Sequence, residues 1–198
     1  MEKRMPTQKR SIEKRNKIIE KGFELICKKG FYNTTTNEIA DYSGVSVGII
    51  YQYFDDKKDI LICGIENYLE KLITPTIKKI ETTKLTDKNI DKSLNDIIET
   101  YIKSHTISKK SHEELEAMSH LDKDVAKIFK DRELKTTKTI VDILNKNKIN
   151  LKNEEEKVHI IIGIVENFCH EMVYHKHKEM HYEVMKKEVI KVIINILK

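Results

Sequence analysis

The chain has 198 residues, of which 35% are charged, with 2 prolines, 6 glycines and a formal net charge of +5. This composition favours long, exposed helices over a β-sandwich, and the modest positive charge favours an anionic partner. The charged N-terminus and the lack of an apolar run of about 20 residues predict a cytoplasmic protein with neither a signal peptide nor a membrane span.

The N-terminal region is predicted to be a basic arm followed by a helix. Residues 1–10 carry an excess of Lys and Arg, so they could neutralise DNA phosphates or enter the minor groove, although an ordinary frayed terminus explains them equally well. The first helix is predicted from Ser11 to Lys29, and Gly30 is a good residue to end it. The residues that recur at helical spacing on its core face are Ile19, Phe23 and Ile26.

Two short helices joined by a tight turn are predicted for residues 34–54. Thr35 is followed three residues later by Glu38, which forms a capping box and begins a helix at the residue after Thr35. Gly44 can adopt positive φ, as a sharp turn between helices requires. The second short helix is predicted from Ser46 to about Tyr53. Four residues form the inner side of this pair: Ile39, Ala40, Ile50 and Phe54.

A set of residues at fixed spacing runs through this region: Gly30, Phe31, Thr34, Thr35, Ile39, Ala40, Gly44, Val45, Ser46, Tyr51, Tyr53, Phe54, Lys57 and Leu61. In this combination the chain resembles the DNA-binding domain of TetR-type transcriptional repressors over roughly its first third. The resemblance implies an all-α protein of about nine helices. Residues 1–56 would form a three-helix DNA-binding domain with a helix-turn-helix, and residues 57–198 a helical domain for ligand binding and dimerisation.

The resemblance also implies which residues contact DNA. Nine positions match family contact positions: Thr36, Asn37, Ser46, Val47, Gly48, Tyr51, Gln52, Tyr53 and Lys57. Asn37 and Gln52 could pair bidentately with adenine, and Val47 and Ile49 could touch thymine methyl groups, which favours an A/T-rich palindromic operator. Two alternatives stay open, because Tyr51 could be a core residue and Val47 an incidental exposed one. The residues suited to phosphate contacts are Thr36, Tyr51, Tyr53 and Lys57.

Four further helices are predicted between residues 55 and 147. The fourth begins at Asp55-Asp56 and ends or kinks near Thr74, because Pro75 lacks a backbone donor and clashes with the preceding turn. A polar connection over residues 78–92 overlaps the start of a fifth helix. Ser111 and Glu114 form a second capping box that would start a short sixth helix. The predicted bounds of the fifth and seventh helices are Lys88–Thr106 and Asp122–Asn147.

The last two helices predict dimerisation. The eighth is predicted from Glu154 to His175 and the ninth from Tyr182 to Leu197, and apolar residues cover more than half of each circumference. A helix that packs only on its own domain needs a narrower apolar face, so we expect a four-helix bundle between two subunits. The alternative is that both helices are central in a monomer. The predicted interface residues are Ile161, Val165, Phe168, Met172, Val189, Ile193 and Ile196.

A small-molecule effector is expected from the resemblance, in an apolar cavity walled by helices four to eight with a few polar anchors. The candidate anchors, each of which could instead be structural or solvated, are Tyr101, His105, Met118, His120, Glu166 and His170. Gly163 lies on the same stripe of the eighth helix as the last two and could mark a close helix approach at the dimer seam.

The leading hypothesis is a homodimeric repressor that leaves a palindromic DNA operator when a small, largely apolar ligand binds. A metal-responsive regulator is an alternative, because His177 and His181 have the spacing of two ligands on one helix face. A helical protein-interaction module that does not read DNA is another. The sequence holds no P-loop, nucleophile elbow or dinucleotide fingerprint, so we predict no enzyme activity, cofactor or bound metal. Free buried thiols are predicted for Cys27, Cys63 and Cys169.

Overall fold

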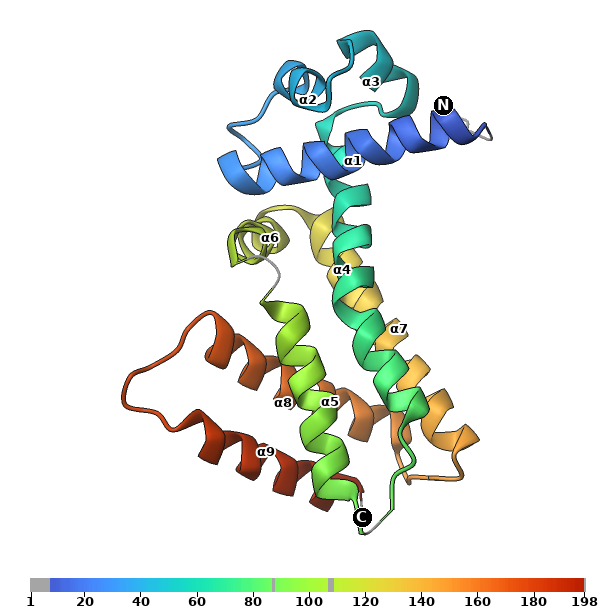
Figure 1. Ribbon diagram of the computed structural model, residues 1–198, viewed down its shortest axis with the longest axis vertical. Coiled ribbons are helices and arrows are strands. Elements are labelled where there is room, and N and C mark those ends of the chain that lie inside the picture. The colour runs from blue at the N-terminus through green and yellow to red at the C-terminus, as the bar shows by residue number, and fades with distance from the viewer. Residues whose placement is uncertain (1–7, 87, 107–108, 198) are drawn as a thin grey trace. The chain divides into compact units, whose positions relative to one another are not determined.

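The computed structural model describes residues 8–86, 88–106 and 109–197. In this part of the chain there are nine α-helices and no strand (Figure 1), which confirms the all-α prediction. None of these helices combines the length and the apolar character that crossing a lipid bilayer requires. The helices are α1 Lys9–Lys29, α2 Thr36–Ser43, α3 Val47–Tyr53, α4 Lys57–Thr82, α5 Ile90–His105, α6 Lys109–Leu121, α7 Lys123–Lys146, α8 Glu154–Val173 and α9 Tyr182–Leu197.

The helices form two compact units. The N-terminal unit holds the described residues up to Leu69 together with Lys110–Ala126, and the C-terminal unit holds Glu70–Lys109 and the residues from Lys127 on. Helix α4 therefore contributes its first half to one unit and its second half to the other. The domain boundary predicted at residue 56 stays a prediction.

The core of the N-terminal unit is made by the apolar faces of α1 to α4. Its fully buried side chains include Ile18, Ile26, Ile39, Ile50, Phe54, Ile60 and Leu61. The four predicted inner residues of the two short helices, Ile39, Ala40, Ile50 and Phe54, are all buried, which confirms the predicted inner side of this pair. Asp56 caps α4 by accepting hydrogen bonds from the backbone N–H groups of Lys58 and Asp59, at 2.7 and 3.1 Å.

A close approach between α1 and α4 depends on glycine at position 64. A Cβ added at Gly64 would lie 2.6 Å from the Cβ of Phe23 on α1, well inside van der Waals contact. The two helices can thus approach closely only because Gly64 has no side chain.

We expect Gly64→Ala to lower the free energy of unfolding by about 1–3 kcal/mol, because the added methyl overpacks the contact with Phe23. Chemical denaturation followed by circular dichroism measures the change. Gly48→Ala is the matched control, since the nearest atom to its added Cβ is the Ser46 hydroxyl oxygen at 3.9 Å. Equal stability of the two variants would contradict this account of the α1–α4 contact.

Of the end or kink predicted near Thr74, the end does not occur, because helix α4 continues through Pro75 to Thr82. The hydrogen bond that Pro75 cannot donate would have gone to the carbonyl of Lys71. Both residues are exposed, so water can take the place of the missing donor. Leu72 and Thr76, on either side of the proline, are buried, and their packing holds the helix together through this point.

The predicted capping box of the sixth helix is also wrong. Helix α6 begins at Lys109, so Ser111 lies within its first turn and is not the capping residue. The carboxylate of Glu114 instead accepts a hydrogen bond from the backbone N–H of Phe31, at 2.7 Å, within the same N-terminal unit.

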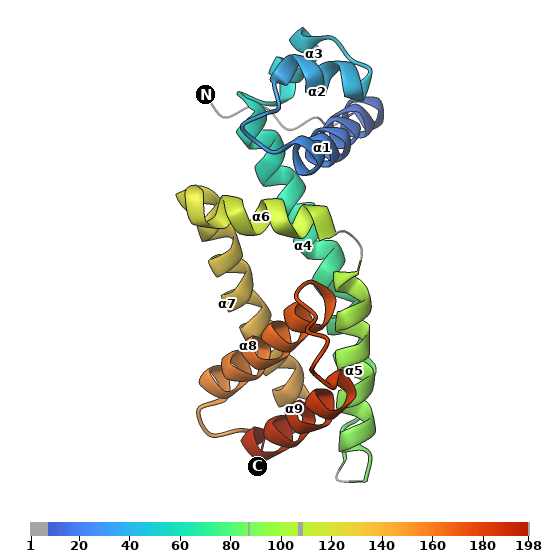
Figure 2. The same cartoon turned by 90° about the vertical axis from the view of Figure 1, so that its left-hand side faces the viewer.

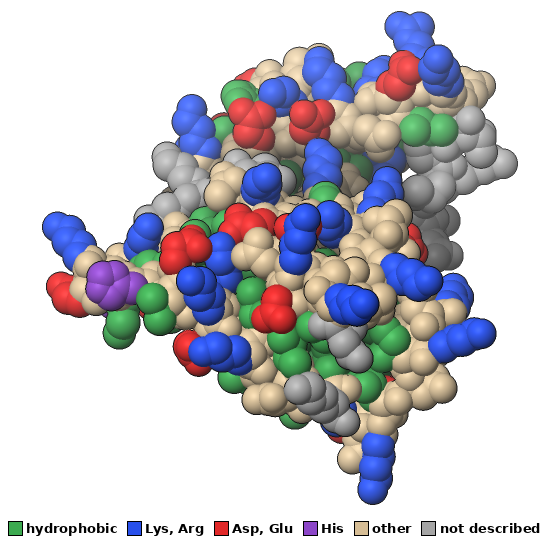
Figure 3. All heavy atoms as spheres, turned by 60° about the horizontal axis from the view of Figure 1, so that its bottom comes forward, with side chains coloured by type: hydrophobic (Ala, Val, Ile, Leu, Met, Phe, Trp, Pro, Cys, Tyr) green, Lys and Arg blue, Asp and Glu red, His purple; other side chains and the backbone are tan. Residues whose placement is uncertain are grey.

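The C-terminal unit is built on α5, α8 and α9, which contact one another in pairs and lie side by side in both views (Figures 1 and 2). Its apolar side chains form two separate buried clusters. The larger cluster consists of Leu94, Ile98, Ile102, Phe168, Cys169, Tyr182, Ile190 and Ile193. The smaller cluster consists of Val141, Leu144 and Val158. Hydrophobic side chains also gather on the lower part of the face in Figure 3.

All three cysteines are free thiols, as predicted, and two of them are buried. Burial raises the pKa of Cys27 to about 11 and that of Cys169 to about 12. Both thiols therefore stay protonated at neutral pH and behave as small apolar side chains.

Candidate nucleic-acid interface and effector site

The start of α2 is fixed by the predicted capping box. The Thr35 hydroxyl accepts from the Glu38 N–H at 3.3 Å, and the Glu38 carboxylate accepts from the Thr35 N–H at 2.8 Å. Lys29 at the end of α1 forms an ion pair with the same carboxylate. The Lys29 hydrogen bond, followed by those from Thr35, lowers the pKa of Glu38 to about 2, so this group is ionised at any physiological pH.

The turn between α2 and α3 has the geometry that its glycine predicts. Gly44 adopts φ +66°, in the left-handed region, and its N–H donates to the carbonyl of Asp41 at 3.0 Å. Val45 then donates to the carbonyl of Ala40 at 3.0 Å. These bonds close the first helix and set the direction of the second, which is the arrangement of a helix-turn-helix.

Helix α3 has one buried and one exposed side. Ile50 and Phe54 are buried, whereas Gly48 and Gln52 are exposed and Tyr51 exposes 50% of its surface. The alternative that Tyr51 is a core residue is therefore not supported. Of the other predicted contact residues, Asn37 and Ser46 are exposed, and Thr36, Val47 and Tyr53 are half-buried. The exposed side offers hydrogen-bonding groups, an aromatic ring and a site of close backbone approach.

Phe54, the residue that follows α3, is fixed by a basic side chain from α1. The guanidinium of Arg15 lies 5.2 Å from the ring centroid of Phe54 and donates to the Sγ of Cys63 at 3.3 Å. The basic arm predicted for residues 1–10 lies mostly outside the described residues. Its last members, Lys9 and Arg10, are exposed in the first turn of α1.

Lys57 differs in setting from the other predicted DNA contacts. Its ammonium donates to the carbonyls of Phe31 and Thr34, at 2.6 and 2.7 Å, and lies 4.4 Å from the ring centroid of Phe31. Together with Glu114, which accepts from the N–H of Phe31, it ties the loop before α2 to α4 and α6. An ammonium has three donors, so two of those of Lys57 are used on the backbone of this loop.

The role of Glu114 was missed by sequence reasoning, and it leads to a testable expectation. Glu114→Ala leaves the N–H of Phe31 without its acceptor, at a cost of about 1–3 kcal/mol in local stability. Amide hydrogen exchange in residues 30–35 should then accelerate by about one to two orders of magnitude. Glu116→Ala, which removes an exposed carboxylate from the same helix, should leave these amides unchanged. Unchanged exchange in Glu114→Ala would show that the loop does not need this bond.

Three of the six predicted effector-binding residues come together in the C-terminal unit. The ring of His105 lies 4.2 Å from that of Tyr101 and 5.5 Å from that of His170, measured between centroids. Tyr174 joins this group and donates from its hydroxyl to the backbone carbonyl of His105 at 2.5 Å. His105 is only 2% exposed, so these rings pack on one another as a buried aromatic cluster.

The other three predicted anchors do not join this cluster by any contact that the structure gives. Burial, with a smaller effect from Glu133, raises the pKa of Glu166 on α8. Met118 is buried and His120 is exposed on α6, in the N-terminal unit. Gly163 is exposed, and a Cβ added there would meet nothing within 4 Å, so no close approach occurs at this position within one protomer.

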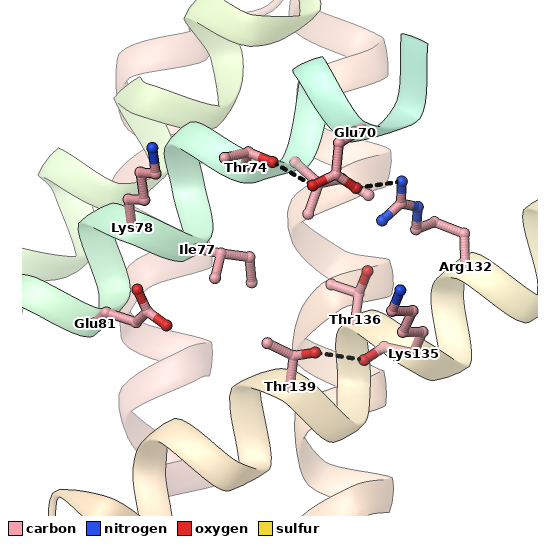
Figure 4. Close-up of a pocket in the computed structure, with 10 residues that line it drawn as sticks. Glu70, Thr74, Ile77, Lys78, Glu81, Arg132, Lys135, Thr136 and Thr139 are labelled. Carbon is pink, nitrogen blue, oxygen red and sulfur yellow. Dashed lines mark hydrogen bonds and ion pairs between the residues drawn. The ribbon is translucent and has the colours of Figure 1, made fainter. Parts of the chain in front are cut away.

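A pocket of about 250 Å³ lies between α4 and α7 in the C-terminal unit (Figure 4). Ile73 and Ile77 contribute apolar surface, and Arg132 forms an ion pair with Glu70 at 2.8 Å at one end. The remaining lining is polar or charged, which differs from the largely apolar cavity predicted. The polar residues that complete it are Thr74, Lys78, Glu81, Lys135, Thr136 and Thr139.

The histidine pair proposed for a metal does not lie on a helix. Helix α8 ends at Val173 and α9 begins at Tyr182, so His177 and His181 belong to the connection. The Nε2 of His177 lies 3.0 Å from a carboxylate oxygen of Glu171. The spacing argument for two metal ligands on one helix face is therefore wrong.

The predicted dimer residues divide into two groups. Phe168 and Ile193 are 2% and 1% exposed inside the larger apolar cluster, so they are core residues of the protomer. The other five are half-buried: Ile161, Val165, Met172, Val189 and Ile196. Apolar residues that sequence reasoning did not select expose more surface on α8 and α9, namely Ile160 at 54%, Val184 at 56% and Val192 at 44%.

The geometry of α2 and α3 is that of a helix-turn-helix, and comparison with known proteins shows which family this part of the chain resembles. Residues 18–62 match the model described as bacterial regulatory proteins, tetR family. The HTH-type transcriptional regulator HbdR of Aromatoleum sp. is 41% identical over 69 residues, which make up 35% of this chain and 30% of that protein's length. The chain therefore resembles the TetR family, as predicted, and its likeness to HbdR is confined to that segment.

Two solved structures extend the likeness to the whole fold. A TetR-family regulator from Syntrophomonas wolfei aligns over 93% of this chain and 95% of its own, with a TM-score of 0.65 and 22% identity. A TetR-family regulator from Mesorhizobium loti aligns over 96% and 98%, with a TM-score of 0.69 and 14% identity. At such identities these matches establish the fold. The relatives are all described as regulators, in agreement with the prediction that the chain is not an enzyme.

Proposed function

We propose that this protein is a homodimeric DNA-binding regulator of transcription that leaves a palindromic operator when a small molecule binds its C-terminal unit. The observation that carries the proposal is the two-sided character of α3, whose inner side is buried and whose outer side exposes Gly48, Tyr51 and Gln52. A helix presented in this way fits the major groove, where glutamine can pair with adenine and tyrosine can reach phosphates.

The proposed dimer uses α8 and α9. Monomers rarely expose contiguous apolar patches without a partner, and Ile160, Val184 and Val192 each expose more than two fifths of their surface. A two-fold axis through such a bundle would present two copies of α3, which the operator matches with two half-sites about 34 Å apart.

The proposed effector site is the pocket between α4 and α7. Helix α4 runs unbroken from Lys57, which holds the loop before α2, to the pocket residues Glu70, Thr74 and Ile77. A ligand that prefers one position of α4 over another would shift the population of DNA-binding conformations. The charged lining favours a polar or amphipathic effector over the largely apolar one predicted from the sequence.

The proposed function is tested by selecting binding sites from random duplex DNA with the purified full chain. The expected product is one enriched palindrome, whose affinity falls linearly with the logarithm of salt concentration because phosphate contacts release counterions. Retention of DNA without any enriched sequence, or no retention, would favour a protein-interaction module and reject the proposal.

A further inference from the structure

A second hollow, of about 620 Å³, opens in the C-terminal unit at the ends of α7 and α9. It is distinct from the pocket between α4 and α7, with which it shares no lining residue. Six apolar side chains line it: Leu85, Ile90, Leu144, Ile149, Ile194 and Leu197. Its volume is within the range of about 300–1,000 Å³ that is usual for small-molecule sites.

The hollow lies where the two apolar clusters of the unit fail to meet. Leu144 belongs to the smaller cluster, and Leu85 and Ile149 pack against it. Ile90, Ile194 and Leu197 pack against the larger cluster. Protein interiors are normally filled to the density of organic crystals. A gap of this size between two clusters therefore leaves apolar surface that a ligand could cover.

The residues that follow or precede the lining residues along the chain, here called the rim, carry an excess of lysine. Five lysines lie within two residues of a lining residue, and all are exposed: Lys84, Lys88, Lys92, Lys146 and Lys148. No ion pair of these ammonium groups occurs among the described residues. Among the described carboxylates, Asp91 lines the hollow beside Thr86, and Asp142 lies two residues before Leu144, so the five lysines exceed these two carboxylates by three.

We propose that this hollow binds an amphipathic anion, with an acyl chain against the six apolar side chains and a carboxylate at the lysine rim. Covering apolar surface supplies most of the binding free energy, at about 25 cal/mol per Å². The positive charge of the lysines favours an anionic head group over a neutral or cationic one. It also raises the association rate of an anionic ligand. A second copy of the same face is a poorer occupant, because a two-fold contact would bring the two lysine rims together.

The site is tested by titrating the full chain with dodecanoate in a calorimeter. We expect one site per chain, with a dissociation constant on the order of 10 µM. Dodecanol and dodecyltrimethylammonium, which keep the chain and change the head group, should bind at least about tenfold more weakly. Equal affinity for the three amphiphiles would overturn the proposal, since it would show that the lysines do not select the ligand.

Two variants locate the site. Lys84→Glu combined with Lys148→Glu should weaken dodecanoate binding by about tenfold or more, because it reverses two rim charges. Leu197→Asp, at a half-buried position near the end of α9, should do the same by placing a carboxylate beside the acyl chain. The control is Lys178→Glu, an exposed lysine of the connection between α8 and α9, which should leave the affinity unchanged.

Circular dichroism shows whether each variant keeps its helices. Folded variants that bind dodecanoate as tightly as the control would exclude the hollow as the site. A change in sedimentation of the ligand-free variants, with dodecanoate affinity intact, would identify the hollow as a subunit contact and overturn the proposal equally. The inference does not depend on DNA reading, since it is measured without DNA.

Discussion

Replacing Tyr51 and Gln52 together by alanine should abolish specific operator binding and leave the protein folded. Both residues are exposed on α3, so their removal should change the free energy of unfolding by less than about 0.5 kcal/mol. A bidentate contact to a base is worth about 1–3 kcal/mol, and a dimer loses it in both half-sites. With the phosphate contacts of the two tyrosines, the loss should reach about 4 kcal/mol, or roughly a thousandfold in affinity.

Fluorescence anisotropy with the selected operator measures this loss, and sedimentation confirms that the oligomeric state is unchanged. The control is Tyr42→Ala. Tyr42 is 41% exposed, and its hydroxyl donates to Glu24 of α1 at 2.6 Å, so it is a surface tyrosine outside the proposed contacts. Operator affinity that survives in the double variant and falls in Tyr42→Ala would move the DNA-binding surface away from α3.

Introducing aspartate at Ile160 and Val192 should split the proposed dimer. The two residues lie on α8 and α9 and expose 54% and 44% of their surface, so the substitutions scarcely disturb the protomer core. In a symmetric interface they would bury four carboxylates, each at a cost of at least about 1 kcal/mol. The dissociation constant of the dimer should then rise by about three orders of magnitude.

Sedimentation velocity of the double variant should show a monomer at concentrations where the unaltered chain is a dimer. Leu134→Asp is the control, because it places the same charge at an apolar residue of α7 that is 46% exposed. Aspartate at Ile193 would be a poor test, since that side chain is 1% exposed and its replacement would unfold the protomer. A double variant that still sediments as a dimer would place the interface elsewhere.

The local features of the helix-turn-helix could be predicted because they are encoded within a few residues. The Thr35–Glu38 capping box, the positive φ of Gly44 and the inward faces of Ile39 and Ile50 each follow from neighbours along the chain. The structure has all of them where the sequence indicates. Such agreement between local preference and global fold is expected of a sequence that specifies one structure.

The features that sequence reasoning missed depend on partners far along the chain. Glu114 has the spacing of a capping residue, but its carboxylate binds the N–H of Phe31, 83 residues away. Pro75 has the signature of a helix end, but the buried residues on both sides of it keep the helix intact. In each case a tertiary contact overrides a local preference, and no pattern within a short segment reports that contact.

The apolar faces of α8 and α9 illustrate a different limit. The hydrophobic periodicity predicts apolar faces on α8 and α9 that are wider than packing within one protomer requires. It does not distinguish the side chains that α5 buries from those that stay exposed. Phe168 and Ile193 are covered within the protomer, whereas Ile160 and Val192 are not. The hydrophobicity of a side chain indicates that it should be buried. It does not identify the helix, or the subunit, that buries it.

Hydroxyl-radical footprinting of the selected operator tests most directly whether two copies of α3 read a symmetric duplex. The proposed account predicts two protected segments, related by a two-fold axis and centred about 34 Å apart, both lost when Tyr51 and Gln52 are replaced. A single protected segment, or protection that persists in the double variant, would contradict it.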